Sequence, residues 1–179
     1  MGLADKIIPY YTYNDWVHWE GKWELVEGSP IAMSPTPVPL HQRVAAEIRG
    51  EFWDALRKSK CTNCRVYDPL DYKIADDTIL IPDILIICGE IKKKFLDFPP
   101  LVVVEILSPS TALRDRHTKY ELYQQQKVKY YIIVDADKKK IEAYMLQNAH
   151  YVLQELSSSY KFFLADDCPI NPDFSKVFE

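Results

Sequence analysis

The sequence lacks a long apolar run. No stretch approaches the roughly 18 residues that a membrane-spanning helix needs, and the first residues, MGLADKIIPYY, lack the apolar core of a secretory signal peptide. The Met-Gly start does not make a myristoylation signal either, because Lys6 stands where that signal requires Ser or Thr. We therefore expect a cytoplasmic protein that does not enter a membrane.

The sequence also lacks an excess of positive charge. It has 22 Lys and Arg against 26 Asp and Glu, a net charge of -4 and a pI of about 5.6. Strong non-specific binding to nucleic acid rests on many Lys and Arg contacts to phosphates, so this composition argues against it. It leaves room for a local basic patch. We expect the lysine runs at 92–94 and 138–140 to be solvated turns between strands.

The four cysteines do not make a recognisable metal site. Cys61 and Cys64 form a C-x-x-C, but a structural zinc site needs four ligands, normally from two such pairs, and Cys88 and Cys168 are isolated. A redox C-x-x-C is expected where a strand meets a helix, whereas this one follows a predicted helix and precedes a strand. We expect reduced, buried cysteines in place of zinc or thiol chemistry.

What the chain does contain suits one globular domain over residues 1–179. Of its residues, 47% are apolar and 27% are charged, which is typical of a soluble protein. A chain of this length can bury a sufficient hydrophobic core without stabilising cross-links. The sequence shows no internal repeat, low-complexity tract or interdomain linker.

Hydrophobic periodicity predicts an α/β (α+β) protein with a mixed sheet and helices packed on it. Pro39 opens a long amphipathic helix whose apolar residues are spaced i, i+4 and i+8. The run 101–107 is apolar on both faces, as in a central strand, and a helix over 113–126 leads from it to a strand over 129–136. That order is a β-α-β crossover, so the two strands should be parallel. The other expected elements are a short helix at 13–19, strands at 23–28, 30–35, 64–68, 70–75 and 79–88, and a three-strand meander beyond residue 140.

Two carboxylates interrupt the most apolar runs, Asp83 in IPDILII and Glu105 in LVVVEIL. An ionised carboxylate is costly to bury unless it is paired, hydrogen-bonded or bound to a metal. If the two runs pair side by side, these acids meet at one end of the sheet, where a cation must separate them or one must stay protonated. Hard oxygen ligands favour Mg²⁺ or Mn²⁺, and such a site suits metal-assisted phosphodiester hydrolysis.

A lysine follows at a useful spacing. Asp115 and Lys119 are i, i+4 in the helix after Glu105, so they share one face, and Lys119 could reach the carboxylates when the helix packs back over the sheet. The alternative is an exposed Asp–Lys pair. For Asp83 the alternative is a turn or cap carboxylate. For Glu105 it is a buried structural acid, although its apolar neighbours favour function.

Several segments together carry a resemblance to a known family. They are WELVEG, PTPVPLHQRV, PDILI, PPLVVVEILSPST, RDRHTKYELY and VKYYIIVD, between about Tyr13 and Asp135. They resemble the Uma-two family of restriction-endonuclease-like nucleases, within the PD-(D/E)XK nuclease superfamily. The resemblance implies a restriction-endonuclease-like mixed sheet flanked by helices. It also implies Asp83 and Glu105 as ligands of Mg²⁺ or Mn²⁺.

The resemblance adds three further site residues. The superfamily pattern places a lysine two residues after the glutamate, where this chain has Leu107, but the Uma-two pattern takes its lysine from the next helix, which matches Lys119. Family members are also similar at Glu24 and His41, either of which could complete the site as an extra acid or a proton shuttle. For His41 the alternative is a solvated helix start. The family often has a small residue before V-x-Y-Y, where this chain has Lys127, a departure expected to affect only the turn.

These patterns lead to a metal-dependent DNA endonuclease as the first hypothesis. A nuclease-fold module that binds nucleic acid or a partner protein without cutting is the second, slightly favoured by the acidic pI. A thiol or zinc protein built on the C-x-x-C is the third. A homodimer would suit the first hypothesis, because two sites related by two-fold symmetry can cut both strands of a duplex.

Overall fold

A six-stranded mixed sheet forms the centre of the protein. The computed structural model describes residues 8–33, 38–157, 160–165 and 168–179. The sheet order is β10-β9-β8-β7-β6-β3, and only the pair β7 and β8 is parallel. This arrangement confirms the predicted β-α-β crossover. The strands are β3 (Cys64–Tyr67), β6 (Ile84–Cys88), β7 (Val102–Ile106), β8 (Tyr130–Asp135), β9 (Lys140–Gln147) and β10 (His150–Gln154).

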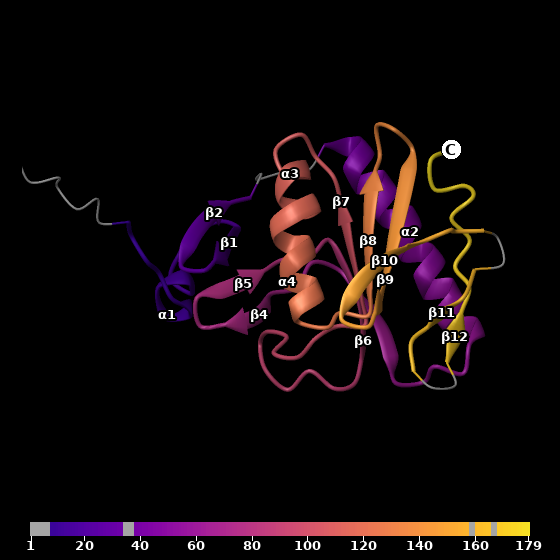
Figure 1. Ribbon diagram of the computed structural model, residues 1–179, viewed down its shortest axis with the longest axis horizontal. Coiled ribbons are helices and arrows are strands. Elements are labelled where there is room, and N and C mark those ends of the chain that lie inside the picture. The colour runs from indigo at the N-terminus through magenta and orange to yellow at the C-terminus, as the bar shows by residue number, and fades with distance from the viewer. Residues whose placement is uncertain (1–7, 34–37, 158–159, 166–167) are drawn as a thin grey trace, which may run out of the picture.

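One face of this sheet is covered by the long helix α2, Pro39–Lys58 (Figure 1). Its apolar stripe, which includes Val44 and Phe52, belongs to the same buried cluster as Val104 of β7. The stripe follows the spacing read from the sequence, so the prediction of this helix is confirmed.

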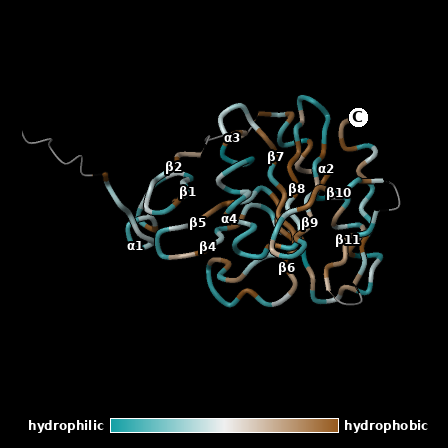
Figure 2. The backbone as a smooth tube through the Cα atoms, in the orientation of Figure 1, coloured by the Kyte–Doolittle hydropathy of each residue, from teal (hydrophilic) through white to brown (hydrophobic). Residues whose placement is uncertain are grey.

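The opposite face carries a continuous helical segment of three parts (Figure 1). These are α3 (Ala112–Arg114), the π-helical turn η1 (Asp115–Lys119) and α4 (Tyr120–Gln125). Tyr123 of α4 and Val103 of β7 lie in one buried cluster on this side. Because β7 is covered on both faces, all five of its residues are buried, and Figure 2 shows hydrophobic residues along the central strands. No helix in the described part of the chain is long and apolar enough to cross a membrane.

A smaller antiparallel sheet, in the order β2-β1-β5-β4, stands beside the central one (Figure 1). The turn between β1 and β2 runs through Glu27 and Gly28, with φ angles of 47° and 77°. Two successive residues of positive φ make the tight hairpin turn that matches strand twist. The elements here are α1 (Tyr13–Trp16), β1 (Trp23–Val26), β2 (Ser29–Ala32), β4 (Tyr72–Ala75) and β5 (Thr78–Leu80).

Three element predictions need correction. The expected strand 79–88 is divided between β5 and β6, which lie in different sheets, because Pro82 has no N–H to give to a ladder. The third segment of the meander does not extend the central sheet. It forms a separate pair, β11 (Phe162–Phe163) with β12 (Pro169–Ile170). The first helix ends at Trp16, short of the predicted residue 19. Residues 34 and 35 of the predicted strand 30–35 lie outside the described residues.

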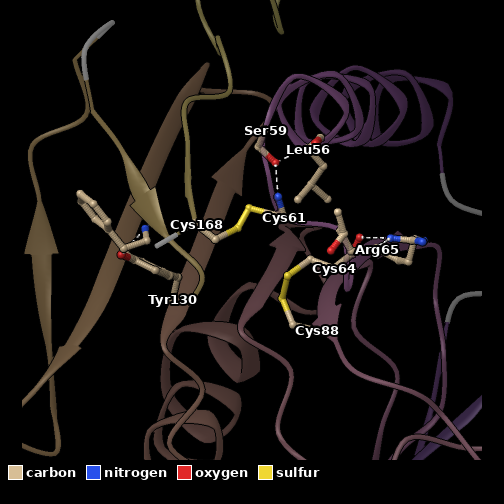
Figure 3. The surroundings of a disulfide bond; sticks show 10 residues. Leu56, Ser59, Cys61, Cys64, Arg65, Cys88, Tyr130 and Cys168 are labelled. Atoms are coloured by element: carbon tan, nitrogen blue, oxygen red, sulfur yellow. Dashed lines mark hydrogen bonds between the residues drawn. A yellow bond between two sulfur atoms is a disulfide. The ribbon is translucent and has the colours of Figure 1, made fainter. Parts of the chain in front are cut away.

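The expectation of reduced cysteines is also wrong. Disulfides join Cys61 to Cys168 and Cys64 to Cys88 (Figure 3). Cys64 and Cys88 stand opposite one another in the β3–β6 ladder. The paired residues are 107 and 24 positions apart, so the C-x-x-C spacing gave no sign of the pairing.

Candidate active site

The pairing of β6 with β7 brings the two predicted metal ligands to one end of the central sheet. Ile84 stands opposite Val104, so Asp83, one residue further along, is level with Glu105. The backbone N–H of Ile106 donates a hydrogen bond to Asp83 Oδ2 at 2.8 Å. The structure thus brings these two acids together at the predicted place.

Lys119 lies among carboxylates from three different elements. Its Nζ is 2.9 Å from Glu105 Oε1, 2.8 Å from Glu24 Oε1 and 3.6 Å from Asp115 Oδ1. Its side chain is 3% exposed, so the alternative of an exposed Asp–Lys pair is wrong. Burial alone would lower the pKa of Lys119, but the three carboxylates outweigh burial and raise it above the ordinary lysine value. The side chain is therefore an ammonium ion, a fixed positive charge inside the protein.

Glu24 joins the small sheet to this centre. Its side chain is fully buried. Besides Lys119, its Oε1 accepts a hydrogen bond from the backbone N–H of Ile81 at 2.9 Å. Ile81 begins the short link that ends at Asp83. The Glu24 carboxylate therefore binds both Lys119 and the segment that carries Asp83.

Glu105 has a second hydrogen-bond donor. Tyr123, one helical turn after Lys119, donates its hydroxyl to Glu105 Oε1 at 2.7 Å. Burial raises the pKa of the Glu105 carboxyl well above its usual range; Lys119 opposes this shift, and the carboxylates of Asp115, Asp83 and Glu24 add to it. The acids therefore lie near enough to repel one another. Tyr123 was absent from the predicted site, although its i+4 spacing from Lys119 was a usable signal.

His41 faces Asp83 from the first turn of α2. Its Nε2 is 3.4 Å from Asp83 Oδ2, and its side chain is 14% exposed. The Asp83 carboxylate raises the pKa of His41 above the ordinary value, although burial opposes the shift. The alternative of a solvated helix start does not describe this residue.

The site opens into a cavity of about 290 Å³. Asp115, one of its wall residues, has a buried Oδ1 with no hydrogen-bond partner in the described part of the chain, and burial raises the pKa of its carboxyl. Sequence reasoning placed Asp115 beside Lys119 but gave it no role, and it missed Arg114. The charged or titratable side chains on the wall are those of His41, Asp83, Glu105, Arg114, Asp115, Lys119 and Asp137. Within the described residues, no three His, Cys, Asp or Glu side chains are arranged as a ready-made metal centre.

The fold is shared with solved structures, of which five chains match. One is described as the crystal structure of "a putative nuclease belonging to DUF820" from Anabaena variabilis. It is 18% identical to this chain with a TM-score of 0.67, and the match covers 83% of this chain and 86% of that one. The comparison confirms the predicted class, a mixed sheet flanked by helices, which the two structures share.

The sequence itself identifies the family. The Uma2 family model, described as "Putative restriction endonuclease", matches residues 10–168. The chain therefore belongs to the Uma2 family, which confirms the resemblance seen in its motifs. No curated protein sequence matches the chain.

Proposed function

We propose that this protein is a metal-dependent endonuclease that hydrolyses phosphodiester bonds in DNA. The observation that carries the proposal is the buried ammonium of Lys119, bound to Glu105 and lining the same cavity as Asp83. Membership of a family described as "Putative restriction endonuclease" supports it. In this proposal Asp83, Glu105 and Lys119 are catalytic, while Glu24 and His41 assist.

The donor set of the cavity suits a hard divalent cation. Asp83, Glu105 and Asp115 all line the wall, and the buried Asp115 Oδ1 has no hydrogen-bond partner among the described residues. Counting Glu24, the described residues give the site five carboxylates, those of Glu24, Asp83, Glu105, Asp115 and Asp137, against two permanent cations, Lys119 and Arg114. Mg²⁺ is commonly held by one or two carboxylates together with waters and substrate phosphate. We propose Asp83 and Glu105 as the ligands of Mg²⁺ or Mn²⁺, which when bound would activate water and stabilise charge on the phosphate.

The protein's own groups have distinct parts in this proposal. Lys119 keeps its proton, because the surrounding carboxylates raise its pKa. It therefore holds the Glu105 carboxylate in place and supplies positive charge near the reacting phosphate, without acting as a base. His41 lies against Asp83 on the cavity wall, where it can give or take a proton.

A cleavage assay tests the proposal. The substrates are supercoiled plasmid, single-stranded DNA and a branched duplex, each with Mg²⁺, Mn²⁺ or chelator. We expect the wild type to cut only with metal, and Asp83→Asn and Glu105→Gln to cut roughly 10²–10³-fold more slowly. Glu105→Gln is preferred to alanine, because alanine would leave a hole beside the Lys119 ammonium.

Glu142→Gln is the matched control. Glu142 is a carboxylate on β9 with a side chain that is 11% exposed, and it does not line the cavity. This variant should cut at the wild-type rate. Unchanged cutting by Asp83→Asn or Glu105→Gln, or cutting in chelator, would refute the proposal.

The second candidate is a module of the same fold that binds nucleic acid or a partner protein without cutting. The net charge of -4 is the observation in its favour. A non-cutting module should bind nucleic acid or a partner protein equally well with and without chelator. It should cut none of the three substrates under any of the conditions above. Metal-dependent cutting by the wild type excludes it.

Cell compartment and assembly stay predictions. We propose the cytoplasm, but the two disulfides argue against it, because the cytosol keeps most thiols reduced. A homodimer is proposed only from the need to cut both strands of a duplex. The molar mass of the protein with and without duplex DNA, measured by light scattering, would show whether two copies associate.

A further inference from the structure

We propose that Arg114 is the phosphate-binding position of the cavity, where its guanidinium receives the anionic oxygens of a nucleic-acid phosphate. The inference rests on the proposed nuclease function for the identity of the substrate. Its physical basis is the loose contact that the Arg114 side chain makes at the start of the π-helical turn.

The two permanent cations on the cavity wall differ in what they already hold. Lys119 is within 3.0 Å of two carboxylates, at 2.8 Å from Glu24 and 2.9 Å from Glu105, and its side chain is only 3% exposed. Those contacts occupy its ammonium. Lys119 therefore orders the acids, and its charge acts on an incoming anion only from a distance, without a direct hydrogen bond.

Arg114 makes a much looser contact. Its Nε is 3.6 Å from Glu24 Oε2, too far for a hydrogen bond. Both atoms are buried, and neither has a hydrogen-bond partner among the residues that the structure describes. The side chain is 17% exposed and lines the cavity. The guanidinium is therefore held only loosely by Glu24, and an anion that enters the cavity beside Arg114 would be stabilised by its charge.

The chemistry of the guanidinium selects the kind of ligand. It is always charged and offers five N–H donors in a planar fork, which suits two oxygens of one phosphate. Asp83, Glu105 and Asp115 on the same wall would repel an anion, so a phosphate needs a cationic contact to enter. Arg114 supplies that contact beside the acids that the proposed reaction uses.

Arg116 provides a matched control two residues further along. Its Nη2 is 2.7 Å from Glu142 Oε2, its side chain is 34% exposed, and it does not line the cavity. Arg116→Gln and Arg114→Gln remove the same charge from the same short segment. Only Arg114→Gln should affect an anion in the cavity.

The first test measures binding with cleavage switched off. The probe is a short fluorescein-labelled single-stranded oligonucleotide in chelator, followed by anisotropy, with inorganic phosphate as competitor. We expect about ten-fold weaker binding for Arg114→Gln, an intermediate loss for Arg114→Lys, and no change for Arg116→Gln. Inorganic phosphate should compete with the oligonucleotide less well in Arg114→Gln than in the wild type.

Three results would overturn the inference. They are wild-type binding by folded Arg114→Gln, an equal loss in Arg116→Gln, and no oligonucleotide binding by the wild type. Melting curves show whether each variant is folded. If Arg114→Gln does not fold, Arg114→Lys decides, since lysine keeps the charge but loses the fork, and unchanged binding would refute the inference.

Cleavage kinetics distinguish a failure of the Arg114 inference from a failure of the proposed nuclease function. With Mn²⁺, Arg114→Gln should raise KM at least as much as it lowers kcat, because it removes a binding contact. A wild type that never cuts counts against the nuclease proposal while the binding arm still reports on Arg114. A wild type that cuts, with the same KM in Arg114→Gln, refutes the role of Arg114 alone.

Discussion

Lys119 is the residue on which the charge balance of the site depends. Glu24, Glu105 and Asp115 are each buried and each lie within 3.6 Å of its ammonium. A buried carboxylate without a partner is strongly unfavourable. The lysine therefore has a structural part as well as the proposed catalytic one, and the two can be separated by measuring stability and activity in the same variants.

Lys119→Met removes the charge while keeping much of the side-chain volume. We expect it to lower the free energy of unfolding at pH 7 by about 3–5 kcal/mol, because the carboxylates lose their shared cation. Part of this loss should return as the pH falls from 7 towards 5. Burial raises the pKa of Glu105 and of Asp115, so without the lysine the folded state takes up protons before the unfolded state does.

Urea unfolding at pH 7 and at pH 5.5 measures this effect. Lys138→Met is the control, since Lys138 is 78% exposed and its partner is Asp135. That variant should resemble the wild type at both pH values. A Lys119→Met protein as stable as the wild type at pH 7 would contradict the buried ion cluster.

For the individual site residues, the sequence predicted which side chains meet, but not how deeply they are buried. Asp83, Glu105 and Lys119 could be named because apolar runs and helical spacing are local signals. The depth of Lys119 depends on Glu24, which comes from a strand 95 positions earlier. Arg114 could not be singled out, because its loose contact exists only in three dimensions.

The helical segment after β7 shows what local patterns do and do not determine. Helical periodicity predicted a helix over 113–126, and one lies there. The π-helical turn within it contains both Asp115 and Lys119, the two residues of η1 that are buried. Such turns are frequent at functional sites, and periodicity alone does not reveal them.

The end of this segment offers a test of helix capping. Val128 N–H donates to Tyr123 C=O and Lys127 N–H donates to Gln124 C=O, which is the Schellman pattern. Lys127 has a φ of 60° at the position where glycine is preferred. We therefore expect Lys127→Gly to raise the free energy of unfolding by about 0.5–1 kcal/mol, measured by urea denaturation.

Lys127→Ala is the control for the loss of charge, because alanine keeps the Cβ that disfavours this backbone conformation. It should bring no such gain. A Lys127→Gly protein no more stable than Lys127→Ala would show that this turn carries no strain. The expectation that Lys127 affects only the turn also requires unchanged cleavage in both variants.

Across the whole molecule, the β-α-β centre was predictable and the connections around it were not. Strands β7 and β8 and helix α2 have continuous apolar patterns, so their type and pairing could be predicted from local sequence. The small sheet pairs Leu25 with Ile79, and one disulfide joins residues 107 positions apart. Such long-range pairs have no local signature.

One disulfide joins two segments outside the central sheet, and the other joins two neighbouring strands within it. One holds Cys168, next to β12, to Cys61 beyond the end of α2, and the other joins β3 to β6. We expect a thiol titration in denaturant to find no free thiols before reduction and four afterwards. Reduction should lower the free energy of unfolding by about 3–5 kcal/mol, because large loops are released in the unfolded chain.

Single cysteine variants show how much of this loss in the free energy of unfolding belongs to each disulfide. Cys168→Ser removes the bond across 107 positions, and Cys88→Ser removes the one across 24. Cys168→Ser should cost more, since the released loop is longer. Four free thiols in protein purified without reductant, with a melting temperature that reductant leaves unchanged, would contradict the cross-linked structure.

Mn²⁺ binding, followed by the paramagnetic resonance signal of the free ion, shows whether Asp83 and Glu105 hold a metal. The proteins are the wild type, Asp83→Asn, Glu105→Gln and the Glu142→Gln control, each with and without an uncleavable phosphorothioate oligonucleotide. We expect Mn²⁺ binding by the wild type and by Glu142→Gln, strengthened by the oligonucleotide and lost in the other two variants. Equal Mn²⁺ binding by all four proteins, or none by the wild type with the oligonucleotide present, would contradict the proposed metal site.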